Sequence, residues 1–148
     1  MAKFFFKLQP LLNIKTQLEN NAKNELGKAV QKLEEEKDRK KQLENYRQKY
    51  IDDFGEKSGK GMRVEKLKEY TAYISHLAHK IEAQNKNIKE ASENVDKHRE
   101  ELVAIVKEIK ILEKLKEKKY KEYLNELQKD EQKVIDELVS YKYTEKEL

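Results

Sequence analysis

The chain has 148 residues, of which 42% are charged and only 36% hydrophobic. So little apolar material cannot fill a thick globular core, but it suits a single domain of long helices that each bury one stripe. The 33 basic residues are nearly balanced by 29 acidic ones, so the net charge of +4 is only weak evidence for binding to nucleic acid. The lack of cysteine excludes disulfides and cysteine metal sites.

No apolar run approaches the ~20 residues that span a bilayer. Lys3, Lys7, Gln9 and Asn13 interrupt any secretory signal core near the N-terminus. We therefore expect a cytoplasmic protein with no direct membrane insertion, which reaches a membrane surface only through a partner.

Glycine and proline divide the chain into two helical segments. Three of the four glycines lie in FGEKSGKGM, residues 54–62, and no proline follows Pro10. Glycines at this density break helices and supply positive-φ positions. The sequence predicts one coiled-coil domain, 1–148, with a first helix at about 10–54, a turn at 55–62 and a second helix at about 63–143.

The first helix has a stripe of residues in steps of three and four, with charged members in its second half. Its members are Ala22, Leu26, Ala29, Leu33, Glu36, Lys40, Leu43, Arg47, Tyr50 and Phe54. Two interpretations of Glu36, and of Gln84 in the second helix, stay open. They are either a solvated weak point or a polar layer that fixes the register of the two helices.

The second helix carries an unbroken stripe of the same spacing, in which all members except Gln84 and His98 are apolar or aromatic. The stripe comprises Leu67, Tyr70, Ile74, Leu77, Ile81, Gln84, Ile88, Ala91, Val95, His98, Leu102, Ile105, Ile109 and Leu112. A period averaging 3.5 residues over this length predicts a left-handed coiled coil.

A short turn between long helices makes the coiled coil antiparallel. A fold-back centred on Gly59 would place Leu43 near Ile74, and the first helix would end near Leu112, where the unbroken stripe also ends. The expected fold class is all-α: a long antiparallel two-helix coiled-coil hairpin with an overhanging second helix.

The expected overhang has its own stripe, which restarts after a change of phase. It consists of Tyr120, Leu124, Leu127, Glu131, Val134, Leu138 and Tyr141. The charge is basic at 114–121 (KLKEKKYK) and mostly acidic at 122–137. Such a stripe favours a helix that lies against another protein, with a solvated single helix and a homodimer contact as alternatives.

Phe4, Phe5 and Phe6 are expected near the level where the first helix ends. Exposed phenylalanines invite aggregation unless something covers them. They either fold back onto Leu112 and Leu115 as a plug or remain exposed as a hook for a partner, and the sequence leaves both open.

We find no catalytic or ligand-binding motif in the chain. GEKSGKG follows no strand and lacks the ending of a phosphate-binding loop, and His76, His79 and Glu82 lack a further ligand. An extended hairpin also offers no dry pocket. We expect no enzyme activity and no cofactor or metal.

The opening residues resemble the start of the FliJ family of flagellar export proteins, as do the length and the unequal helices. The matching residues are Phe4, Phe6, Lys7, Leu8, Gln9, Leu11, Leu12, Ile14 and Lys15, followed by Glu25, Leu26 and Ala29. Phe5 and Pro10 depart from the family pattern.

The resemblance implies a component of the flagellar type III export apparatus that is peripheral to the inner face of the cell membrane. The family is similar to the central stalk of rotary ATPases. By that similarity the chain would occupy the export ATPase hexamer, activate it, and connect it to the export gate membrane protein and to export chaperones. The free end would enter the ring and the turn would face the gate or the chaperones.

The expected partner-binding residues are Phe4, Phe6, Leu8, Leu11, Leu12, Ile14, Tyr120, Leu124, Leu127, Val134, Leu138 and Tyr141. A stalk should be largely monomeric when isolated. The alternatives are a structural coiled coil that homodimerises through the distal half of the second helix, and a related stalk of a virulence secretion system. Electrostatic binding to nucleic acid or an anionic membrane through 114–121 is disfavoured by the interspersed acids.

Overall fold

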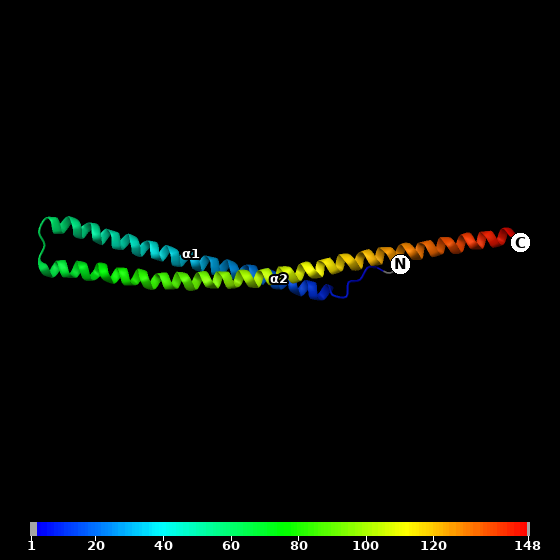
Figure 1. Ribbon diagram of the computed structural model, residues 1–148, viewed down its shortest axis with the longest axis horizontal. Helices are drawn as coiled ribbons and strands as arrows, with labels where there is room; N and C mark the ends of the chain where they lie inside the picture. The colour runs from blue at the N-terminus through cyan, green and yellow to red at the C-terminus, as the bar shows by residue number, and fades with distance from the viewer. Residues whose placement is uncertain (1–2, 148) are drawn as a thin grey trace. The chain divides into compact units, whose positions relative to one another are not determined.

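The computed structural model describes residues 3–147 and contains two long helices (Figure 1). Helix α1 is Gln9–Gly59 and helix α2 is Val64–Glu147. The two helices pack against each other, and no strand occurs in the described residues. The predicted fold class, an all-α hairpin, is confirmed.

The chain divides into two compact units, which we describe separately. One is Asn20–Val103, and the other combines the residues up to Glu19 with those from Ala104 onward. The single domain expected from the sequence, 1–148, stays a prediction.

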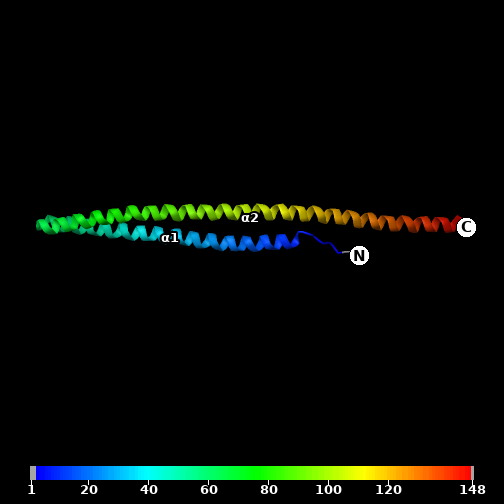
Figure 2. The ribbon, with the colours of Figure 1, turned by 90° about the horizontal axis from the view of Figure 1, so that it is seen from below.

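In the unit Asn20–Val103, α1 and α2 run antiparallel on either side of the turn (Figures 1 and 2). Ala29, Leu77 and Val95 are its buried apolar residues. All the predicted stripe positions of both helices within this unit are buried or half-buried except Leu67, which is 38% exposed beside the turn. The 3.5-residue period therefore identified the contact between the helices correctly.

Glu36 and Gln84 form a polar layer inside this contact. The Gln84 amide Nε2 donates to the Glu36 carbonyl oxygen at 2.7 Å and to the Glu36 carboxylate. Lys32 Nζ lies 2.9 Å from the other carboxylate oxygen. The hydrogen bond from Lys32, and then that from Gln84, holds the pKa of Glu36 below its ordinary value. Both side chains are buried and bonded to each other, as expected of a polar layer rather than a solvated weak point.

The turn lies later than the glycines suggested. Helix α1 continues past residue 54 to Gly59, and Gly61 has a φ of 90°, which favours glycine. Lys57 Nζ donates to the Tyr70 hydroxyl at 3.2 Å, so contacts with α2 support the extra helical residues. The pairing of the helices shows the same shift. A fold-back centred on Gly59 would place residue 82 opposite Glu36, but Glu36 is bonded to Gln84.

The other unit is built around a small apolar cluster between the start of α1 and the middle of α2. Its buried members are Phe6, Leu12, Ile109 and Leu112, and Phe4, Ile105 and Leu115 pack against them. Beside the cluster, Lys15 forms an ion pair with Glu108. Segments far apart in the sequence are therefore held together by this cluster and by the ion pair beside it.

Helix α2 continues well past this cluster. All described side chains of residues 128–146 are exposed, and no other segment of this unit lies beside the end of α2 (Figure 1). The overhang predicted from the sequence is present, but it begins later than expected, because Phe4 packs against Tyr120 and Tyr123. Among the described residues, neither helix has a stretch long and apolar enough to cross a membrane.

Candidate partner-binding surface

The structure separates the three N-terminal phenylalanines by their burial. Phe6 is 6% exposed in the apolar cluster, whereas Phe5 is 78% exposed. Phe4 packs edge-on against Tyr120, with ring centroids 5.2 Å apart, and lies 5.7 Å from Tyr123. Phe4 and Phe6 therefore pack as the plug interpretation expects, whereas Phe5 is exposed, and a role of Phe5 as a hook for a partner stays a prediction.

The other predicted residues of the N-terminal stretch also divide by burial. Leu12 is buried beside Phe6, while Leu8, Leu11 and Ile14 are exposed. Because α1 places successive residues 100° apart, one side of its first turns faces α2 and the other faces solvent. Leu8, Leu11 and Ile14 are available to a partner, and Phe6 and Leu12 hold the segment in place.

The predicted distal residues lie along the overhang of α2. Tyr120, Leu124, Val134, Leu138 and Tyr141 are exposed, and Leu127 is half-buried. Sequence reasoning missed Ile135, which is 52% exposed and adjoins this stripe. A strict sequence of threes and fours passes over it, although Ile135 lies four residues after Glu131 on the same side of the helix.

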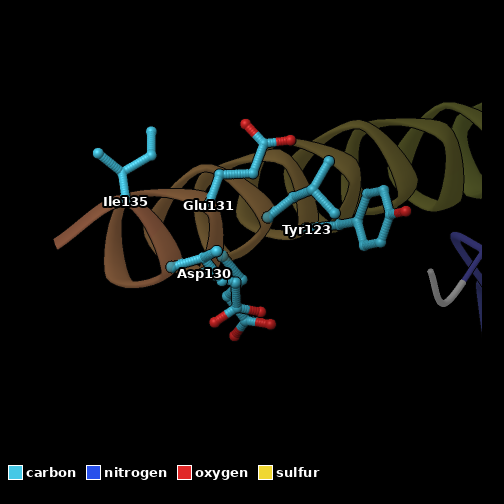
Figure 3. Close-up of a pocket in the computed structure, with 7 residues that line it drawn as sticks. Tyr123, Asp130, Glu131 and Ile135 are labelled. Carbon is cyan, nitrogen blue, oxygen red and sulfur yellow. The ribbon is translucent and has the colours of Figure 1, made fainter. Parts of the chain in front are cut away.

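A shallow groove runs along this part of α2 (Figure 3). Tyr123, Leu127, Val134 and Ile135 provide its apolar surface. Glu126, Asp130 and Glu131 are its charged lining residues, and all three are acidic. In Figure 3 the carboxylates of Glu131 and Asp130 project to different sides of the helix.

A second groove lies beside the N-terminal segment, in the same unit. Its apolar lining comes from the three phenylalanines, Leu8, Leu115 and Tyr123, and its charged lining is Lys3, Lys7, Lys119, Glu122 and Glu126. Because both signs of charge surround this groove, its electrostatics favour no particular class of ligand.

An aromatic cluster lies near the turn in the unit Asn20–Val103. The ring of Tyr50 lies 4.4 Å from that of Tyr73 and 6.1 Å from that of Tyr70. The Tyr70 hydroxyl donates to Asp53 Oδ2 at 2.8 Å, and this bond is the main reason that the pKa of Asp53 is lowered. The bond between Lys57 and Tyr70 is the main reason that the pKa of Lys57 is raised. The sequence stripe contained Tyr50 and Tyr70 but missed Tyr73.

The histidines occupy ordinary positions on a helix. His98 Nδ1 lies 3.3 Å from Glu101 Oε2, and the His76 ring packs near Tyr73. Within residues 3–147, no group of three or more histidine, cysteine or acidic side chains could hold a metal ion.

These features, two unequal helices and an exposed distal stripe, accompany a match over nearly the whole chain. Residues 4–148 match the family described as "Flagellar FliJ protein". The chain belongs to the FliJ family. It is accordingly a component of the flagellar protein export apparatus, and FliJ proteins are structural export components rather than a known class of enzyme. The resemblance of the opening residues is thereby confirmed. No curated protein and no solved structure gives a significant match.

Proposed function

We propose that this FliJ protein is the central stalk and activator of the export ATPase hexamer and an adaptor to the export gate and export chaperones. The observation that carries the proposal is the exposed end of α2. Residues 128–146 keep an apolar and tyrosine stripe in solvent, although a helix without a partner needs no such stripe. At 1.5 Å per residue this stretch is about 28 Å long.

The candidate residues take two roles in this proposal. Phe4, Phe6 and Leu12 fasten the N-terminal segment to α2. The remaining candidates contact the host, and they are the exposed Leu8, Leu11, Ile14, Leu124, Val134, Leu138 and Tyr141, the half-buried Leu127, and the face of Tyr120 that Phe4 leaves exposed. The turn, with its aromatic cluster, would face the gate or the chaperones. The protein is then cytoplasmic and peripheral to the inner face of the cell membrane through its partners.

Mixing the purified chain with the export ATPase tests this function. We expect a complex on size exclusion and faster ATP hydrolysis, and a chain shortened to end after Leu127 should give neither effect. Unchanged turnover together with no complex would contradict the proposal. Loss of motility in a deletion strain would distinguish a flagellar role from one in a virulence secretion system.

A homodimer through the distal half of α2 is the second candidate. Its support is the coiled-coil spacing of Leu127, Val134, Leu138 and Tyr141, which could pair with a second copy. Sedimentation equilibrium separates the candidates, because a stalk is largely monomeric when isolated.

A further inference from the structure

The groove on the distal part of α2 has an asymmetric distribution of charge around the helix. At 100° per residue, Leu127 and Val134 lie 20° apart and mark the centre of the apolar face. Glu131 then lies about 40° to one side of Leu127, and Asp130 about 60° to the other. Figure 3 shows the two labelled carboxylates diverging in this way.

The neighbouring lysines lie away from this face. By the same geometry Lys129 lies about 160° from Leu127, on the opposite side of the helix, and Lys133 lies about 120° from it, farther round than Asp130. In the described part of the chain, no ion pair neutralises Asp130 or Glu131, whereas Glu126 also lines the groove that contains Lys3, Lys7 and Lys119. The apolar face is therefore bordered by unneutralised negative charge.

We propose that this face, residues 123–135, binds a basic amphipathic helix of a partner protein. Apolar side chains of that helix pack on Leu127, Val134 and Ile135, and its lysine or arginine side chains reach the carboxylates of Asp130 and Glu131. The inference rests on the proposed function, since it names the chemistry of the host surface that meets the overhang.

The basic stretch of a second copy does not fit this role. Residues 114–121 are the chain's own basic helical segment, but Leu115 already packs against the apolar cluster of its own chain. Tyr120 is likewise engaged by Phe4. Residues 114–121 therefore lack the free apolar stripe that the groove requires.

Binding of a designed helical peptide to the full chain tests the inference. The probe is a labelled four-heptad peptide with leucine at its core positions and lysine beside them, and its control carries glutamate in place of lysine. We expect the lysine peptide alone to bind, with an affinity that falls as salt is raised. Glu131→Lys should weaken binding about tenfold, because it places like charge against the peptide.

Asp136→Lys is the matched control variant. It makes the same change in charge, but Asp136 lies half a turn around the helix from Leu127, so its effect should be small. Equal weakening by both variants, or equal binding of the glutamate peptide, would overturn the inference. The inference would also be overturned if the chain formed a dimer that Glu131→Lys dissociates, because a second copy of the chain would then occupy the groove. The peptide assay contains no ATPase, so its failure is distinct from failure of the stalk proposal.

Discussion

Replacing Phe6 with alanine should detach the N-terminal segment from α2, whereas replacing its neighbour Phe5 should not. Full burial of a phenylalanine side chain is worth about 3 kcal/mol. Phe6 is 6% exposed, so its burial contributes nearly all of this free energy. Phe5 is 78% exposed, so its burial contributes about a fifth of it, or about 0.6 kcal/mol. Residues 3–6 lie outside any helix and can relax into the vacated space, so we add no cavity term.

Hydrogen exchange at the start of α1 measures this difference. The Gln9 amide donates to the Phe6 carbonyl at 3.1 Å and the Leu12 amide to the Leu8 carbonyl at 2.9 Å, so both amides report on the attachment. Phe6→Ala should speed their exchange by more than about a hundredfold, and Phe5→Ala by about threefold. Similar effects of the two variants would refute the assignment of Phe6 as the plug.

Two further predictions concern the turn and the polar layer. Gly61→Ala should lower the free energy of unfolding by about 1 kcal/mol, because alanine is strained at the positive φ of this position. Gly55→Ala should raise it by a similar amount, because alanine favours a helix more than glycine does and the added methyl group meets no neighbour. Denaturant titration measures both changes. The pKa of Glu36 is lower folded than unfolded, so the carboxylate stabilises the fold above its ordinary pKa and that contribution is lost as pH falls through the lowered value. The melting temperature should therefore fall less steeply on acidification in Glu36→Gln than in the unmodified chain; equal slopes would contradict this.

The helices and their contact could be predicted from the sequence because their signal is local and repeated. Each step of three or four residues returns to the same helix face, so the stripe from Leu77 to Leu112 indicates burial without knowledge of the partner helix. The same reasoning identified the overhang, because a stripe that outlasts the first helix has nothing in the chain to pack against.

The turn and the roles of single residues depend on tertiary contacts that periodicity does not contain. Gly55 and Gly59 remain helical because packing outweighs a glycine cost of about 1 kcal/mol each. To predict the hydrogen bond between Gln84 and Glu36, one must know the register of the two helices. To predict that Phe6 is buried and Phe5 exposed, one must know where α2 lies beside the N-terminal segment.

Labelling of a single cysteine on the overhang tests the central claim most directly. The chain has no cysteine of its own, so Leu138→Cys gives a unique maleimide site on the exposed stripe, and Lys86→Cys gives an exposed control in the other unit. When the export ATPase and nucleotide are added, labelling at position 138 should slow markedly while labelling at position 86 stays unchanged. A stable complex in which position 138 is labelled as fast as in the free chain would contradict the account.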